Sequence, residues 1–313
     1  MALQNSMHRG SRHLVGRTVL RSLCFGSERT PGYNDFKTLT VAQPVEAVFQ
    51  VEINRPDKAN AMSRTFFKEL RQCFDTLAGD PTCRAVVICG SGSVFSAGID
   101  LEEFGPTFRD MTATSGEGGK DPARKSVDIM RFVSGMQETF ASLNSCPNPV
   151  ISAIHSACIG AGVDLVCATD IRMASSDAWF SVKEVDIGLC ADLGTLQRLP
   201  KLIGSDSLAR ELVFTARKFP AAEALATGFL SSTAENKQEL LNRAITLGSE
   251  IAARSPVAIQ GSKVNMNYSR DHPIDQALQY QALWSSVMLQ TVDIPHAMSM
   301  AVQRKPPPTF PPL

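Results

Sequence analysis

Apolar and polar residues alternate over 49–53, which predicts a strand with one buried face. A continuous apolar run at 85–89 predicts a strand that is covered on both faces, as in a parallel sheet. Residues 150–154 predict another buried strand and residues 171–174 a third. After the first strand, Ser63 precedes apolar residues at helical spacing, which predicts a capped helix. Strands therefore alternate with helices in the first two thirds of the chain.

Residues 105–127 are rich in Gly, Ser, Thr and Asp and have no period, so we expect a loop there. Apolar spacing over 129–143 predicts a helix after it. Beyond residue 201 the pattern is helical, and Ser255 followed by Pro256 indicates a helix start. The predicted class is α/β with a helical region that begins at about residue 200.

Composition is that of an ordinary globular protein, with 43% hydrophobic and 20% charged residues. The formal net charge is zero, so no global field favours nucleic acid or an anionic membrane. No apolar run approaches the roughly 20 residues that span a bilayer. The eight cysteines show no C-x-x-C spacing, which favours free thiols in a reducing compartment over structural zinc.

The two ends of the chain differ from the rest. Four arginines and several serines precede the first acid, Glu28, which predicts a mitochondrial transit peptide over 1–32. A disordered basic tail is the alternative. Residues 306–313 form a proline-rich tail that does not end in Ser-Lys-Leu, so a standard peroxisomal signal is not found.

Two turns of small residues follow predicted strands, one at 95–100 and one at 158–165. Small residues let the backbone approach a ligand, and a helix start after such a turn directs free N–H groups at an anion. Two such turns together would form an oxyanion hole that stabilises an enolate. Taken alone, each turn fits tight strand–helix packing equally well.

Four ordered motifs carry a resemblance that runs from about residue 49 to 269. They are NRPDKANA at 54–61, AGID at 97–100, GAGVDL at 160–165 and GTLQRL at 194–199. In this combination the chain resembles the crotonase (enoyl-CoA hydratase/isomerase) superfamily. The resemblance implies a spiral of ββα units over 33–238 and a helical C-terminal oligomerisation region over 239–313, with subunits in trimers or hexamers.

The resemblance also implies binding residues. The oxyanion hole maps onto the backbone N–H groups of Ile99 and Ala161. Ala161 stands where the family often has glycine, so its methyl group tightens the pocket. The expected contacts with coenzyme A (CoA) are Lys58, Ala59, Asn60, Ala61, Ala97, Gly98 and Gly160.

Three acids carry the narrower interpretation. Family hydratases usually have Glu at the positions of Asp164 and Glu184 and Gly at the position of Asp192, whereas this chain has a third carboxylate. That combination resembles the Δ3,5-Δ2,4-dienoyl-CoA isomerases of unsaturated fatty acid β-oxidation. Moving a 3,5-diene to 2,4 removes a proton at C2 and adds one at C6, which suits a separate base and acid. We assign Asp192 as base, Glu184 as acid and Asp164 as the group that orients the site, with the order of base and acid left open.

Each acid also has a structural interpretation. Asp164 could favour a helix N-terminus, Glu184 could pair with Lys183 in solvent, and Asp192 could be a turn residue. The apolar neighbours of Asp192 weigh against the last, because an unpaired buried carboxylate is costly.

Other functions fit the sequence less well. An enoyl-CoA hydratase is the nearest enzyme alternative, and position 192 separates the two. An RNA-binding homologue would need a basic stripe, yet the helix after Ser63 offers only Arg64, Lys68 and Arg71 among acids. A non-catalytic scaffold does not require both turns and all three acids. No metal or redox cofactor is expected, because CoA arrives as part of the acyl-CoA substrate.

Overall fold

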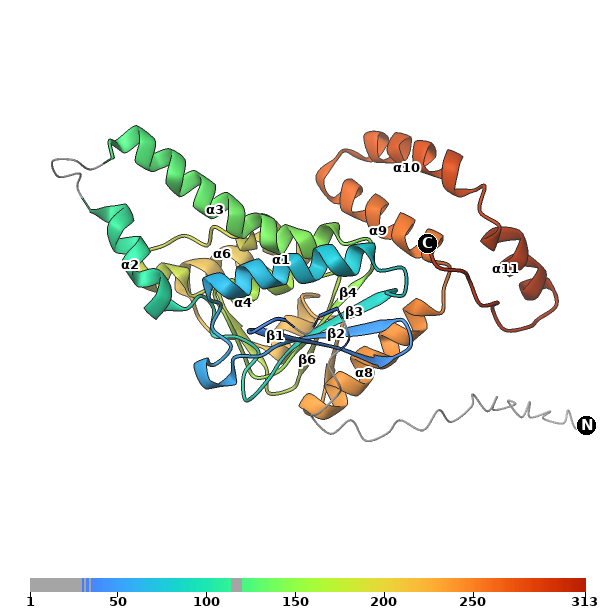
Figure 1. Cartoon of the computed structure of the whole chain (residues 1–313), viewed down its shortest axis with the longest axis horizontal. Coiled ribbons are helices and arrows are strands. Elements are labelled where there is room, and N and C mark those ends of the chain that lie inside the picture. Colours follow the sequence, from blue (N-terminus) through green and yellow to red (C-terminus); the bar gives the residue numbers. More distant parts are fainter. Residues whose placement is uncertain (1–29, 31, 34, 114–119) are drawn as a thin grey trace, which may run out of the picture.

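Six strands form a central sheet, in the order β1 (Leu39–Val45), β2 (Val48–Ile53), β3 (Ala85–Gly90), β4 (Val150–Ile154), β6 (Ile171–Ser175) and β9 (Ser232–Ala234) (Figure 1). Neighbours are parallel except β1 and β2. The computed structural model describes residues 30, 32–33, 35–113 and 120–313, so nearly all of the predicted transit peptide lies outside the described residues. The four strands predicted from the sequence are confirmed.

A second sheet contains the short strands β5 (Ala157–Ile159), β7 (Trp179–Ser181) and β8 (Phe219–Pro220). In the chain, β5 follows β4 and leads into helix α4 (Ala161–Cys167). β7 likewise follows β6. A parallel bridge between Ser96 and Cys158 ties the first small-residue turn to β5. Each unit thus has a strand in the large sheet, a segment along the small one and a helix. The crotonase-like α/β fold is confirmed.

Both faces of the central sheet are buried. Val86 and Ile88 of β3 point into one hydrophobic cluster, which α1 (Arg64–Gly79) and α3 (Pro122–Ser145) complete. Val87 and Cys89 point into a second cluster beneath α8 (Lys237–Ala252) (Figure 1). Helix α1 begins at Ser63, whose Oγ accepts a hydrogen bond from the N–H of Phe66, as predicted.

The expected loop over 105–127 is wrong for most of its length. Residues Leu101–Thr112 form helix α2, which Asp100 caps, and α3 already begins at Pro122. Gly105 and Pro106 disfavour a helix, but Phe104 is buried and its ring packs edge-on against Phe67 of α1 and Phe132 of α3. Tertiary packing of one aromatic face therefore overrides weak local propensity.

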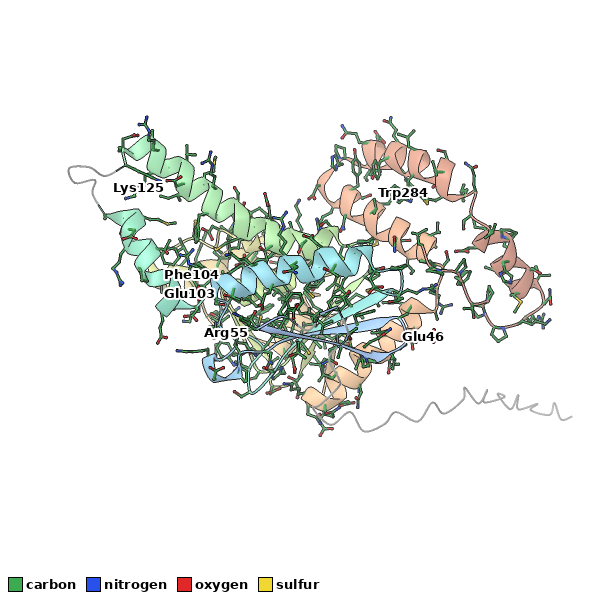
Figure 2. All side chains as sticks on the ribbon, viewed as in Figure 1. Glu46, Arg55, Glu103, Phe104, Lys125 and Trp284 are labelled. Carbon is green, nitrogen blue, oxygen red and sulfur yellow. The ribbon has the colours of Figure 1, made fainter. Side chains whose placement is uncertain are left out.

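The remaining helices lie mostly in the C-terminal part, as expected. They are η1 (Pro56–Lys58), η2 (Glu184–Ile187), α5 (Thr195–Leu202), α6 (Asp206–Thr215), α7 (Ala221–Ala226), α9 (Pro256–Asp271), α10 (Ile274–Met288) and α11 (Asp293–Val302). Helices α9–α11 form an arm beside the core, and Trp284 marks its position (Figures 1 and 2). A buried ion pair of 2.7 Å between Lys263 and Asp170 attaches α9 to the core. No helix in the described ranges has the length and apolarity to cross a bilayer.

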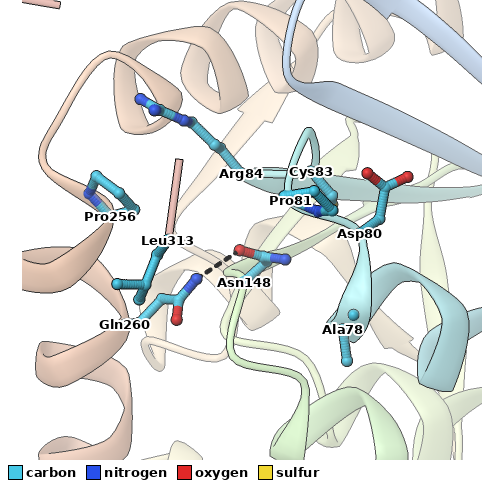
Figure 3. A pocket seen from close by; sticks show the side chains of 10 residues that line it. Ala78, Asp80, Pro81, Cys83, Arg84, Asn148, Pro256, Gln260 and Leu313 are labelled. Atoms are coloured by element: carbon cyan, nitrogen blue, oxygen red, sulfur yellow. Dashed lines mark hydrogen bonds between the residues drawn. The ribbon is translucent and has the colours of Figure 1, made fainter. Parts of the chain in front are cut away.

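The end of the chain returns to the core at the N-terminal ends of β3 and β4. Arg84 donates hydrogen bonds to the backbone oxygens of Ala252 and Phe310, and Phe310 is buried. Leu313 lines a small pocket there with Asn148 and Gln260 (Figure 3). The two small-residue turns follow the opposite, carboxyl ends of these strands, so this pocket and the predicted site lie at opposite edges of the sheet.

Candidate active site

The two small-residue turns lie against each other. In the first, Gly98 has φ of 90°, and a Cβ atom there would meet the oxygen of Ile159 at 2.9 Å. Glycine is therefore required both by the backbone conformation and by the close approach of the second turn. The N–H of Ile159 in turn donates to the oxygen of Ser96 at 3.0 Å. These contacts place the predicted oxyanion residues of both turns in one region.

The backbone N–H groups of Ile99 and Ala161 are those predicted to form the oxyanion hole. Among the described residues, neither N–H donates a backbone hydrogen bond. The N–H groups on either side of Ile99 do have partners: that of Gly98 donates to Ser96 Oγ and that of Asp100 to the Met62 oxygen. Ala161 is the first residue of α4, where a helical N–H has no partner within the helix. The Ala161 side chain is buried. Alanine in place of glycine keeps the backbone N–H at this position.

The three predicted acids come together beside these turns. Asp164 lies on α4 and is 1% exposed, while Glu184 begins η2 and is 9% exposed. Asp192 is half-buried in the segment before α5. A Cβ atom on Gly160 would lie 3.3 Å from Glu184 Oε1, so this carboxyl group reaches the second turn. The solvated pair between Glu184 and Lys183 is not formed, because Lys183 bonds Asp186 instead.

The predicted CoA segment is anchored to the first turn. Asn60 is fully buried, and its Nδ2 donates to the oxygens of Ser91 and Val94 at 2.8 and 2.9 Å. Arg55 forms a 3.0 Å ion pair with Asp100, which caps α2 directly after Ile99. The Asn60 side chain thus holds the loop in shape. Arg55 holds Asp100 beside the first turn, and the sequence analysis did not identify this role.

The other members of that segment differ in exposure. Ala59 and Asn60 both have positive φ, of 50° and 54°, so the backbone turns sharply here. Lys58 is exposed and pairs with Glu102 at 2.8 Å. Ala61 donates its N–H to the oxygen of Lys58 at 2.9 Å. Ala97 donates to the oxygen of Ala59 at 3.0 Å, which places the segment alongside the turn.

A family model described as enoyl-CoA hydratase/isomerase matches residues 44–309 of the chain. The chain belongs to this family. It is 45% identical over 304 residues to the mitochondrial Delta(3,5)-Delta(2,4)-dienoyl-CoA isomerase of Rattus norvegicus, covering 95% of this chain and 91% of that protein. It is 39% identical to the peroxisomal Delta(3,5)-Delta(2,4)-dienoyl-CoA isomerase of Arabidopsis thaliana, covering 87% and 96%.

Solved structures agree with the family. The crystal structure of an enoyl-CoA hydratase from Bacillus anthracis matches with a TM-score of 0.76 and 25% identity over 87% of this chain and 98% of that one. Pseudomonas aeruginosa DspI matches with a TM-score of 0.77 and 26% identity over 90% and 99%.

In this enoyl-CoA hydratase/isomerase family member, Glu184 keeps its proton to a higher pH than an ordinary glutamate. Burial raises the pKa of Glu184 to about 7, and the charges of Asp164 and Asp192 add to the rise. Its Oε2 is buried and has no hydrogen-bond partner among the described residues. A protonated carboxyl group with a free O–H is what a general acid requires.

Asp164 and Asp192 are held by different contacts. The backbone N–H of Thr195 donates to Asp164 Oδ1 at 2.6 Å and opposes the burial that raises the pKa of Asp164 to about 6. Burial also raises the pKa of Asp192. The Asp192 backbone oxygen accepts a hydrogen bond of 2.6 Å from Gln137 of α3. Across the described ranges, no group of three or more His, Cys, Asp or Glu side chains has an arrangement that could hold a metal ion.

Proposed function

We propose that the chain isomerises 3,5-dienoyl-CoA to 2,4-dienoyl-CoA in the β-oxidation of unsaturated fatty acids. The observation that carries this proposal is the third carboxylate, Asp192, which lies close enough to Asp164 and Glu184 to raise their pKa values. Relatives from rat, human and Arabidopsis that are 39–46% identical are named as isomerases of this kind.

The reaction requires one proton removal and one proton addition. The Asp192 carboxylate takes a proton from C2, and the electron pair of that bond moves toward the thioester carbonyl. The N–H groups of Ile99 and Ala161 stabilise the resulting extended enolate. The enolate then collapses as Glu184 donates its proton to C6, which leaves double bonds at C2 and C4. Proton exchange with solvent restores both carboxyl groups.

Asp164 orients the site. Its contact with Thr195 fixes the start of α5, which lies three residues after Asp192 in the chain. The segment 58–61 with Ala97, Gly98 and Gly160 holds CoA, which enters as part of the substrate, and the reaction needs no separate cofactor.

Location and assembly follow the same reasoning. The basic segment 1–32 and the mitochondrial isomerases of rat and human support a mitochondrial, matrix location, although the Arabidopsis relative is peroxisomal. Exposed apolar side chains on α10 and α11 support a trimer or hexamer. They include Leu278, Leu283, Val287, Met298 and Val302.

The decisive experiment supplies purified protein with a 3,5-dienoyl-CoA and follows the absorbance of the conjugated 2,4-dienoyl product. We expect product without added metal or nucleotide. The same preparation is offered a 2-enoyl-CoA, because a hydratase from Clostridium acetobutylicum is 30% identical to this chain. Efficient hydration without isomerisation would overturn the proposal in favour of a hydratase.

A further inference from the structure

Gln137 of α3 contacts the backbone that carries Asp192. The two residues are 55 positions apart, and Gln137 Nε2 donates to the Asp192 backbone oxygen at 2.6 Å. Because the glutamine bonds the backbone, the carboxylate of Asp192 stays available for substrate. Gln137 itself is on an exposed part of α3, so this contact is not a by-product of core packing.

The segment that carries Asp192 packs into the core through Ala191 and Leu193, but it has few hydrogen bonds near its middle. It runs from Gly188 to Gly194, both with positive φ, and contains no helix or strand. Its other hydrogen bonds among the described residues lie toward its two ends. At one end, the N–H groups of Gly188 and Leu189 donate to oxygens of η2. At the other, the Gly194 oxygen accepts from the first turn of α5 and the Leu193 oxygen accepts from the Arg198 side chain at 3.5 Å. The Gln137 bond is the shortest of these and, among the described residues, the one that is made to the Asp192 backbone itself.

We propose that Gln137 is a positioning residue that places the Asp192 carboxylate at C2 of the substrate. This inference rests on the proposed isomerase function. A general base must lie within about 3 Å of the proton it removes, and a displacement of about 1 Å can cost as much as 100-fold in rate. The neutral amide of Gln137 supplies a donor without adding charge next to the base.

Two substitutions at Gln137 distinguish its effect on the position of Asp192 from the effect of charge beside Asp192. Gln137→Met keeps the length and helix propensity of the side chain and removes the donor. Gln137→Lys keeps a donor of similar reach and adds a positive charge, which favours the ionised form of Asp192. Glu138→Gln is the matched control, because Glu138 is the adjacent residue of α3 and pairs with Arg71 on the surface, away from the acids.

Four quantities are measured for each variant: kcat, KM, the rate of hydrogen exchange at C2 in D2O, and the melting temperature. We expect Gln137→Met to lower kcat and C2 exchange by about 10- to 100-fold, with KM and melting temperature nearly unchanged. Gln137→Lys should retain most of kcat and shift the acid limb of the pH profile to lower pH. Glu138→Gln should behave as wild type.

Several outcomes would overturn the inference. Wild-type kcat and C2 exchange in Gln137→Met would show that Asp192 needs no support from α3. A fall in melting temperature that accompanies the loss of rate, equal in the Met and Lys variants, would show a purely structural role. A wild-type protein that neither isomerises dienoyl-CoA nor exchanges C2 hydrogen would refute the proposed function itself, and this result is read before any variant is made.

Discussion

The backbone N–H of Thr195 donates a 2.6 Å hydrogen bond to Oδ1 of Asp164, and this bond joins the helix that follows the second turn to the segment that carries the third acid. Asp164 lies in α4 and Thr195 begins α5. A displacement of one acid therefore reaches the other through a single short contact. We therefore expect a substitution at one acid to affect the other.

Replacing Asp192 by Asn removes the proposed base and keeps the shape of the side chain. We expect the isomerisation rate to fall by about 100-fold or more, with binding of the acyl-CoA retained. Product absorbance gives the rate, and calorimetric titration with a product or substrate analogue gives the binding. Asp186→Asn is the control, because Asp186 pairs with exposed Lys183. Full activity of the Asp192 variant would show that the base has been assigned to the wrong residue.

The pH profile reports the proton on Glu184. The proposed mechanism needs Glu184 protonated and Asp192 ionised, and burial raises the pKa of Glu184 to about 7. We therefore expect kcat/KM to rise with pH as Asp192 ionises and to fall again above about pH 7 as Glu184 loses its proton. These apparent pKa values belong to the coupled acids together. Glu184→Gln should be slow at every pH and should lack the alkaline limb; an unchanged alkaline limb would exclude Glu184 as the acid.

The same group makes stability depend on pH. The pKa of Glu184 is higher in the folded state than in the unfolded chain, so the folded state binds more protons between about pH 4.5 and 7. Its contribution to the free energy of unfolding is therefore largest below that range and is lost as pH rises through about 7. Glu184→Gln should be more stable than wild type at pH 8, by about 1–3 kcal/mol in urea unfolding. Equal stability at pH 8 would contradict this.

Two glycines give a matched test of backbone constraint. Gly194 has φ of 128°, and a Cβ atom there would lie 1.8 Å from Nη1 of Arg198. Gly194→Ala should lower the free energy of unfolding by about 1–3 kcal/mol and reduce activity. Gly135→Ala, in the interior of α3 with open space around it, should instead add about 0.5–1 kcal/mol. The pair is measured by urea unfolding, and equal effects would show that Gly194 is not constrained.

The ion pair between Lys263 and Asp170 stabilises the attachment of α9. The Lys263 side chain is 5% exposed and its Nζ also donates to the backbone oxygens of Leu143 and Asn148. Lys263→Met should therefore cost about 2–3 kcal/mol, because it leaves these two oxygens without that donor and the Asp170 charge without its cation. Adding Asp170→Asn to that variant should recover part of the loss. Lys201→Met, which breaks a pair of half-exposed side chains with Asp271, should cost less than about 1 kcal/mol. Similar costs for both lysines would contradict the role of burial.

Much of the sheet could be predicted because continuous apolar runs leave few alternatives. The run at 150–154 matches β4 residue for residue. Helix α2 could not be predicted, because its local sequence contains Gly105 and Pro106 and its stability comes from Phe104 packing on two other helices. The periodicity of apolar residues along the sequence reflects one helix or strand at a time and does not reveal contacts between helices.

Only part of the candidate site, likewise, could be predicted from the sequence. Spacing and family resemblance pointed to Asp164, Glu184 and Asp192, and their roles stay predictions. Their burial and mutual influence on pKa emerge only from the fold. The bonds from Arg55 to Asp100 and from Gln137 to Asp192 join residues 45 and 55 positions apart, a separation at which a single sequence carries no pairing signal.

The return of residues 306–313 to the core has a practical consequence. Arg84 holds this tail where β3 and β4 begin, whereas the two turns follow the strand ends at the opposite edge of the sheet. A fluorescent label or a surface tether attached at Leu313 would therefore emerge far from the route that an acyl-CoA takes to the acids. Immobilised protein prepared in this way should turn over substrate as freely as protein in solution.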